Sequence, residues 1–380
     1  MATAVVRGPH RDGVPEQRRW TSQIQGRTAR RRPRNLGLTP RTLAPYDRRV
    51  QRDRTSRVRQ EITSLARAGL DWVTFASAVS ESLNTVIPFD RCCWHTVDPG
   101  TVLFTGSLHR GVQCSGRWLA EYEYVIDDVN KWWFLARSGR MAGATSLATC
   151  GDLSRSARHR SQEAQGIGDE LRGAFVADGN YWGAAGFLRD SAGPWFTQAD
   201  VQFLASMSGT LGSGLRSALL RPVSVDEVPV LADGPGVVVF DEHGLVEFIS
   251  AAADQLIAQM VEEPIGGAPG DALAVQAVAA RVRGQACDGD PLPLDARSRV
   301  QTRSGSWLLL YGTSLAGKRR GRTAVVIQPA AGSEVAPLVA LAYGLSTREC
   351  QVVQLCMEGC STRQMATALH VSPYTVQDHL

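Results

Sequence analysis

Several features are scarce or missing in this chain of 380 residues, and each absence excludes a class of protein. No apolar run approaches the roughly twenty residues that a membrane-spanning helix needs. No secretory signal peptide opens the chain either. The sequence therefore predicts no membrane partner and a cytoplasmic protein.

The eight cysteines form no CxxC pair. Three of them cluster at Cys350, Cys356 and Cys360, but no histidine stands at ligand spacing beside them. Metal sites built on cysteine use such spacings, so reduced thiols are the better interpretation. We expect no metal site, and reduced thiols again favour the cytoplasm.

Catalytic patterns are also missing. The sequence holds no G-x-S-x-G, no HExxH and no Walker-type phosphate loop. Asp127-Asp128 and the scattered histidines have no spacing typical of general acid–base work, and no receiver-like succession of parallel strands can be traced. The sequence thus predicts a protein that is not an enzyme and has no cofactor. One enzymatic alternative stays open, thiol redox chemistry at Cys92 or Cys93.

Lysine is nearly absent, with Lys131 and Lys318 the only two. Residues 1–60 hold sixteen arginines against four acidic residues, a local charge of +12, so the remainder carries −8. A basic arm that grips nucleic acid or a membrane is one interpretation. Residues 1–57 show no sustained hydrophobic period, however, and are predicted to be disordered or a misread gene start, with the true start near Val58.

The most informative stretch is residues 345–380. Ser346 with Glu349 and Ser361 with Gln364 fit the capping-box pattern at two helix starts. Ser372, followed by proline, fits a third start. Gly359 stands where a left-handed residue would close the first helix.

Apolar residues fall on one side of each of these three helices, which predicts a small trihelical core. The expected core positions are Val353 (with Val352), Cys356, Met365, Ala366, Leu369, Val376 and Leu380. A unit this small usually serves to hold its third helix in the DNA major groove.

This segment resembles the DNA-binding domain of LuxR-type regulators, through the string SPYTVQDHL above all. The resemblance implies that Ser372, Tyr374, Thr375 and His379 lie near the phosphate backbone. It also implies that Gln377 and Asp378 face base edges, where an amide can pair with adenine and a carboxylate can accept from cytosine.

The segment departs from that family in length and charge. The family's recognition helix continues beyond this point and a fourth helix follows, so the module is predicted to be truncated. Residues 345–380 also carry two basic against three acidic residues, a net charge of −1. Because phosphate neutralisation supplies most non-specific affinity, this charge predicts weak DNA binding.

Residues 58–220 predict an α+β domain. A helical period, broken near Gly69, ends before Pro88, and two hairpins follow, around Asp98-Pro99-Gly100 and Gly179-Asn180. A helix is expected over 121–136, and Thr197 is expected to cap a closing helix that runs to about residue 220.

The order of these elements, with the string GNYWGAAGFLRD, is similar to a GAF domain. The resemblance implies a small-ligand pocket on one face of the sheet. Candidate lining residues are Trp94, Trp118, Trp132, Trp133 and Trp182, although aromatic residues at these spacings are more often core. His95 beside Cys92 and Cys93 invites a haem or redox hypothesis, but a lone strand histidine is usually packed.

A linker is expected over residues 221–233. The string GVVVFDEHGLVEFISAAADQL then resembles the opening of a PAS domain, which implies a second α+β domain over 234–329, with a five-stranded sheet. Residues 266–303 are too rich in alanine, glycine and proline to assign. A second linker, 330–344, would set the angle between the sensory domains and the helix-turn-helix, and we suspect a switch there.

The whole chain is therefore expected to be multidomain: a GAF-like α+β domain, a PAS-like α+β domain and an incomplete all-α helix-turn-helix. The predicted function is a one-component transcription regulator, a homodimer that senses a small ligand and binds promoter DNA. The alternative is a truncated sensory protein that does not bind DNA and acts by ligand binding or by pairing with a full-length relative.

Overall fold

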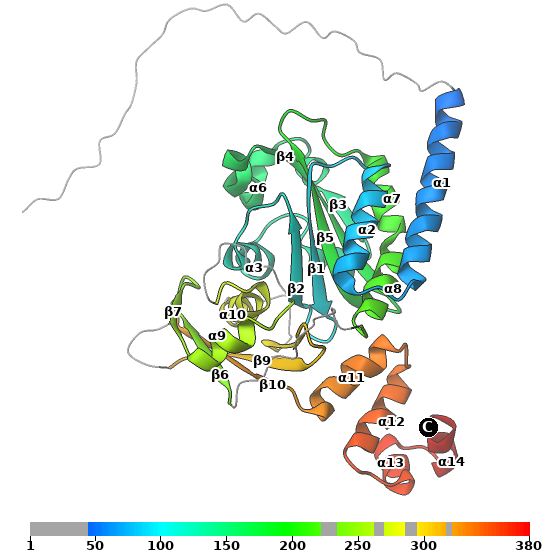
Figure 1. Cartoon of the computed structure of the whole chain (residues 1–380), viewed down its shortest axis with the longest axis vertical. Coiled ribbons are helices and arrows are strands. Elements are labelled where there is room, and N and C mark those ends of the chain that lie inside the picture. The colour runs from blue at the N-terminus through cyan, green and yellow to red at the C-terminus, as the bar shows by residue number, and fades with distance from the viewer. Residues whose placement is uncertain (1–44, 222–233, 262–269, 286–294, 317–320) are drawn as a thin grey trace, which may run out of the picture. The chain divides into compact units, whose positions relative to one another are not determined.

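The computed structural model describes residues 45–221, 234–261, 270–285, 295–316 and 321–380 (Figure 1). Residues from Arg49 to Leu380 form one compact unit. Within the described ranges, no helix combines the length and the apolar character needed to cross a membrane. The predictions for residues 1–44 and for most of the first linker lie outside the described residues.

The first half of the unit is built on a five-stranded antiparallel sheet in the order β2-β1-β5-β4-β3. Its strands are β1 (Arg91–Asp98), β2 (Leu103–Arg110), β3 (Ala142–Ala144), β4 (Ile167–Ala177) and β5 (Asn180–Asp190). Both predicted hairpins are present, β1–β2 and β4–β5. Side chains alternate between the two faces of a strand, and nearly all of β1 is buried, so both faces of the sheet are covered.

Four helices belong to one side of this sheet: α1 (Pro45–Arg67), α2 (Trp72–Asn84), α7 (Gln198–Ser206) and α8 (Ser208–Ala218). Apolar residues from them share one core with Trp94, Phe175 and Phe187 of the sheet. Helices α2 and α8 approach closely because α8 has a glycine there. A Cβ on Gly214 would lie only 2.2 Å from Cζ of Phe75.

Two helix predictions need correction on this side. Helix α1 begins at Pro45, thirteen residues before the expected domain start at Val58. Its extra turns are rich in arginine, which has a good helix propensity, so the absence of an apolar period does not exclude a helix. The expected closing helix is two helices, with Met207 between them.

The opposite side of the first sheet carries shorter helices: α3 (Gly116–Tyr124), α4 (Trp132–Arg137), α5 (Thr145–Ala148) and α6 (Ala157–Gln162), with 3-10 turns at Leu153–Arg155 and Glu163–Gln165. The single helix predicted over 121–136 is therefore wrong. Asn130 has φ +54° there, and Asp128 accepts hydrogen bonds from the backbone of Val129 and Arg158. These local bonds compete with a continuous helix.

The second half of the unit contains another five-stranded antiparallel sheet, in the order β7-β6-β10-β9-β8. Its strands are β6 (Gly236–Phe240), β7 (Val246–Ile249), β8 (Arg297–Gln301), β9 (Trp307–Ser314) and β10 (Thr323–Pro329), and α9 (Ala251–Ile257) packs on β6. Numbered within their own set of five, the strands of both sheets follow the same order, so the two α+β halves share one plan.

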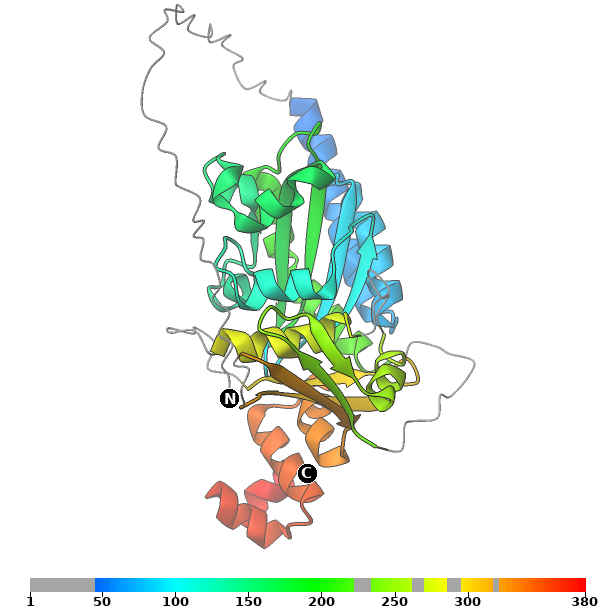
Figure 2. The ribbon, with the colours of Figure 1, turned by 90° about the vertical axis from the view of Figure 1, so that its left-hand side faces the viewer.

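Helix α10 (Leu273–Gln285) joins the two halves (Figure 2). It packs against β9 and β10 of the second sheet and also against α3 and β2 of the first half. Nearly every one of its residues is buried, including Ala274, Ala277 and Val278. Together with β8, it occupies the segment that the sequence left unassigned.

Four helices end the chain: α11 (Gly332–Ala342), α12 (Thr347–Met357), α13 (Thr362–Leu369) and α14 (Pro373–Asp378). The expected linker over 330–344 is therefore largely a helix. Leu338 and Ala342 of α11 are buried in the same core as the helices of the first half. This segment is anchored by its apolar side rather than free to swing.

Candidate functional site

The three C-terminal helices are positioned by their caps. Ser346 and Glu349 exchange two hydrogen bonds, from the Ser346 amide to Glu349 at 2.6 Å and from the Glu349 amide to the Ser346 hydroxyl at 3.3 Å. Ser361 and Gln364 form the same box on α13. Ser372 accepts from the Thr375 amide at 3.0 Å on α14. All three predicted starts are confirmed.

The turn between α12 and α13 is the expected glycine turn. Gly359 has φ +77°, and the amide of Cys360 donates to the carbonyl of Leu355 at 3.0 Å. This is the Schellman arrangement, which satisfies the last carbonyls of a helix. The turn fixes the direction in which α13 leaves α12.

The core of this module is smaller than predicted. Val352, Met365, Ala366 and Val376 are buried, and Leu355, Cys360, Leu369 and Val371 pack against them. Val353 is only half-buried, while Cys356 and Leu380 are exposed, so their assignment to the core is wrong. Leu355, three residues after Val352 and so on the same side of α12, packs against this core instead of Cys356.

The side chains of α14 divide between structure and solvent. Ser372 and Thr375 are engaged with each other, their hydroxyls 2.9 Å apart. Tyr374 is 80% exposed, and Gln377 and Asp378 are exposed as well. His379 is half-buried. Of the six predicted DNA contacts, Tyr374, Gln377 and Asp378 are therefore the ones whose side chains face solvent without a structural task.

The two arginines of the module have different roles. Arg348 donates to the backbone carbonyl of Leu369 at 2.6 Å and to Gln351 at 3.0 Å, so it ties α12 to the end of α13. Arg363 is exposed. Only Arg363 is left to meet a phosphate within residues 345–380.

A second site lies in the first half, on the face of the first sheet that carries Cys93, His95 and His109, here called the histidine face. Cys93 and His109 are direct partners across β1 and β2, so their side chains are adjacent. His95 lies two residues from Cys93 on β1 and therefore on the same face. The rings of His95 and His109 are 5.5 Å apart.

His95 is fully buried, and neither of its ring nitrogens has a hydrogen-bond partner among the described residues. Phe104 and Trp132 pack against it, with ring centroids 4.8 and 5.2 Å away. Burial, with smaller contributions from His109 and Arg172, lowers the pKa of His95 well below its usual value, so the ring is neutral. A buried polar ring without partners is costly.

His109 and Cys114 complete the edge of the histidine face. His109 lies 2.5 Å from the hydroxyl of Ser107 through Nε2 and 3.9 Å from Sγ of Cys114 through Nδ1. Burial lowers the pKa of His109 to about 4 and raises the pKa of Cys114 to about 12. Both side chains are therefore uncharged at neutral pH.

Beside the histidine face lies a buried ion network that the sequence analysis missed. Glu170 accepts from Arg158 at 2.7 Å and from Arg172 at 2.9 Å, and Arg172 also reaches Glu123 at 3.1 Å. Burial alone would raise the pKa of Glu170, but the two arginines lower it to about 2. The signal was present in β4, where Glu170 and Arg172 alternate along a strand otherwise made of buried residues.

The five predicted pocket tryptophans do not meet in one place. Trp94 and Trp182 lie in the core on the helical side of the first sheet, and Trp94 donates to Ser80 at 2.8 Å. Trp132 and Trp133 lie in the other core, where Trp132 is stacked under Arg172, and Trp118 is only packed against that core. The sheet separates the two groups, so they form no single cage.

Metal and thiol chemistry find little support in this site. Within the described ranges, no group of three or more His, Cys, Asp or Glu side chains is arranged to hold a metal ion. Cys92 and Cys93 are buried, and burial raises the pKa of both thiols. Reactive cysteines need the opposite shift, so these two buried thiols are poorly suited to redox chemistry.

Residues 344–380 match the luxR family of bacterial regulatory proteins. The C-terminal module is a LuxR-type helix-turn-helix. This match supports DNA-binding transcription regulation as the task of α12 to α14. No curated protein matches the chain.

Solved structures similar to the chain include a phycoerythrobilin-bound GAF domain from a cyanobacterial phytochrome, at 11% identity, covering 43% of this chain and 95% of that one, with a TM-score of 0.31. A far-red-absorbing dark state with bound biliverdin IXa is 13% identical over 42% of this chain and 98% of that one, TM-score 0.27. The E. coli DhaR(N)–DhaL complex is 14% identical, covering 76% of this chain and 91% of that one, with a TM-score of 0.21.

One buried contact connects the first half to the segment before the LuxR-type module. Arg299 of β8 donates to both carboxylate oxygens of Asp98, at 2.8 and 2.6 Å, and Asp98 is almost completely buried at the β1–β2 turn. The same guanidinium donates to the carbonyl of Glu334 in α11 at 3.4 Å. Bidentate pairs of this kind fix orientation as well as distance.

Proposed function

We propose that this protein is a one-component transcription regulator, in which ligand binding at the histidine face controls DNA binding by the LuxR-type module. The observation that carries the proposal is the module itself, with three α14 side chains, Tyr374, Gln377 and Asp378, facing solvent. Gln377 would read adenine and Asp378 cytosine, while Tyr374 would lie at the phosphate backbone.

The first half would be the sensor, a GAF-like domain. Support comes from the histidine face, where His95 leaves two buried ring nitrogens without partners. The buried hydroxyl of Tyr181 also lacks a partner among the described residues. A small ligand that offers hydrogen bonds to such groups would remove the cost of leaving them unpaired.

The second half would be a PAS-like domain that transmits the signal. Its support is the strand order it shares with the first sheet, and its contact through Arg299 with both Asp98 and α11. β1 carries His95 and also ends at Asp98. A shift of β1 on ligand binding would therefore move Asp98, and the guanidinium of Arg299, which contacts both Asp98 and Glu334, would transmit the movement to α11.

The regulator would act as a homodimer in the cytoplasm, because helix-turn-helix proteins generally read two half-sites through a two-fold axis. Control would be a population shift, limited by how differently the ligand binds the two states. Sedimentation at DNA-binding concentrations tests the dimer, and a monomer that still protects two half-sites would refute it.

Capture of DNA tests the proposal. The chain is incubated with fragmented bacterial genomic DNA at fixed salt, and retained fragments are sequenced. We expect a recurring sequence, lost with Gln377→Ala and kept with Gln354→Ala, an exposed glutamine on α12. Retention without any common sequence, or the same sequence with both variants, would refute base reading by α14.

A further inference from the structure

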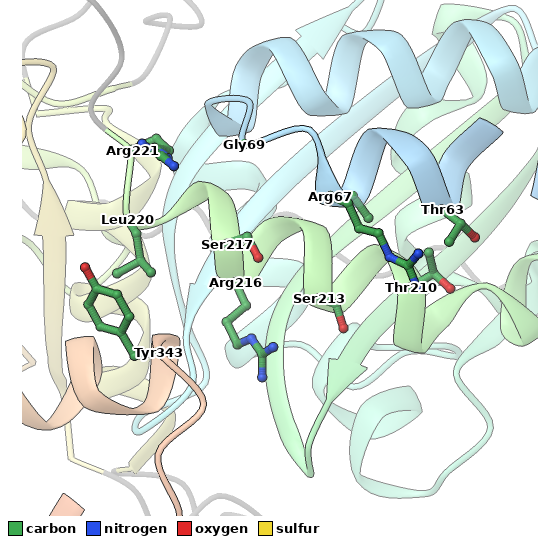
Figure 3. A pocket seen from close by; sticks show the side chains of 11 residues that line it. Thr63, Arg67, Gly69, Thr210, Ser213, Arg216, Ser217, Leu220, Arg221 and Tyr343 are labelled. Carbon is green, nitrogen blue, oxygen red and sulfur yellow. The ribbon is translucent and has the colours of Figure 1, made fainter. Parts of the chain in front are cut away.

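A second cavity lies on the helical side of the first half, away from the histidine face. It has a volume of about 660 Å³ and is formed by α1, the turn after it, α8 and the end of α11 (Figure 3). Its size falls in the range of sites for small molecules. The sheet lies between this cavity and His95, so the two sites are independent.

The lining of this cavity is basic and rich in hydroxyl groups. Three arginines line it, and none of the described lining residues is acidic. The hydroxyl groups come from Thr63, Thr210, Ser213 and Ser217. Guanidinium groups and hydroxyls are the side chains that bind phosphate oxygens, and arginine does so through two parallel hydrogen bonds.

Most of the positive charge of these three arginines is not neutralised by acidic side chains. Within the described residues, Arg67 and Arg221 have no ion pair or side-chain hydrogen bond. Arg216 pairs with Asp178, a side chain that is 71% exposed, while its Nε is buried without a partner. Three positive charges facing one negative charge leave the cavity with a net charge of about +2.

Two of these arginines lie close to the backbone turns that border the cavity. Gly69 has φ +67°, and a Cβ there would lie 3.5 Å from Nη2 of Arg221. A Cβ on Gly344 would lie 3.7 Å from Nη1 of Arg216. Arg216 thus lies beside the first residue of the segment that matches the luxR family.

Tyr343 supplies the remaining wall. It is the residue after α11, and its ring is 70% exposed while it lines the cavity. An exposed aromatic ring beside three arginines is suited to a ligand that has a planar ring at one end and phosphates at the other.

We propose that this cavity binds a nucleoside polyphosphate, with the phosphates on Arg67, Arg216 and Arg221 and the base against Tyr343. The ligand would contact α1, α8 and Tyr343 at once. It would thereby hold the start of the LuxR-type module against the first half. This is an input separate from the histidine face, and it goes beyond the proposed function.

Titration calorimetry of the chain with ATP, GTP, AMP, inorganic pyrophosphate and inorganic phosphate, at constant ionic strength, tests the site. We expect one saturable site for the triphosphates with a micromolar Kd, and weaker binding of AMP and phosphate. Arg221→Gln or Arg67→Gln should weaken triphosphate binding about tenfold. Arg140→Gln, at an exposed arginine outside the cavity, should leave it unchanged.

A second comparison separates the ring from the phosphates. Tyr343→Ala should weaken ATP and GTP several-fold and leave pyrophosphate unchanged. The proposal is overturned if no triphosphate binds below the millimolar range, or if Arg140→Gln weakens triphosphate binding as much as Arg221→Gln does. Calorimetry with nucleotides does not depend on DNA binding, so a failure of the DNA-binding proposal with the Gln377→Ala variant leaves it unaffected. The nucleotide-site proposal and the proposed function can therefore fail independently.

Discussion

The pKa of His109 predicts how the stability of the chain depends on pH. Its folded pKa is about 4 because the ring is buried, whereas an unfolded histidine titrates near 6.5. Between about pH 6.5 and pH 4, the unfolded chain therefore binds more protons at this position than the folded chain does. Stability from the neutral His109 ring is complete above pH 6.5 and is lost as the pH falls toward 4.

The size of the effect follows from the same two values. Between pH 7.5 and 5, protonation of this histidine stabilises the unfolded state by about 2 kcal/mol. The figure corresponds to about 1.5 pH units below the unfolded pKa, at 1.36 kcal/mol per unit. The folded state with its pKa of about 4 gains almost nothing. His95 changes in the same direction, because its pKa is also lowered. Glu123, whose pKa is raised by burial, opposes the loss at lower pH.

Urea unfolding at pH 7.5 and 5.0 measures this difference. His109→Gln keeps a hydrogen-bonding group beside Ser107 but does not titrate, so its stability should fall by about 2 kcal/mol less than that of the wild type. His243→Gln, at a side chain 74% exposed, is the matched control. If His109→Gln and the wild type lose equal stability between the two pH values, the assignment of a neutral buried His109 is refuted.

Three further predictions concern the other contacts. Met365→Ala should lower the stability of the LuxR-type module by about 2–5 kcal/mol and unfold it locally, whereas Cys356→Ala should change it by less than about 0.5 kcal/mol. Hydrogen exchange of α12 to α14 compares the two variants, and equal losses of stability would show that Cys356 belongs to the core. Arg299→Ala should lower the free energy of unfolding in urea by about 3–5 kcal/mol, because the buried Asp98 carboxylate then loses its ion-pair partner. A loss below about 1 kcal/mol would show that the pair is not buried in solution. Gln377→Ala should leave the melting temperature unchanged but relax the preference for one base by about 1–3 kcal/mol in competition binding, and unchanged selectivity would contradict its role.

The elements that the sequence predicts well are those with local signals. The caps at Ser346, Ser361 and Ser372 act within three residues, so they can be read without knowing the rest of the fold. The hairpins at Gly100 and Gly179 are equally local. Both hairpins therefore occur at the predicted turns.

Helix α10 escaped prediction for a physical reason. An amphipathic period arises when one side of a helix faces water, but α10 packs against the second sheet on one side and against α3 and β2 on the other. Burial on every side removes the period, and small residues such as Ala274 and Ala277 carry little hydrophobic signal. The tertiary structure, not the local sequence, makes this segment a helix.

The histidine face escaped prediction because its residues come together from distant elements. His95 and His109 meet through strand register, and Trp132 reaches them from a helix more than twenty residues later. In the sequence alone, His95 is a lone strand histidine, which is usually an ordinary core residue. What distinguishes it is the lack of a hydrogen-bond partner, which only the three-dimensional structure shows.

Control of DNA binding from the histidine face is the central claim, and one titration tests it most directly. Fluorescence anisotropy on the captured DNA sequence is measured at fixed salt, with and without the small-molecule fraction of a bacterial extract from which nucleotides have been removed, for the wild type and for His95→Phe. The account predicts at least a fivefold change in the wild-type Kd and no change for His95→Phe, whose buried ring offers no hydrogen bond. An equal response of both proteins, or no response of the wild type, would contradict it.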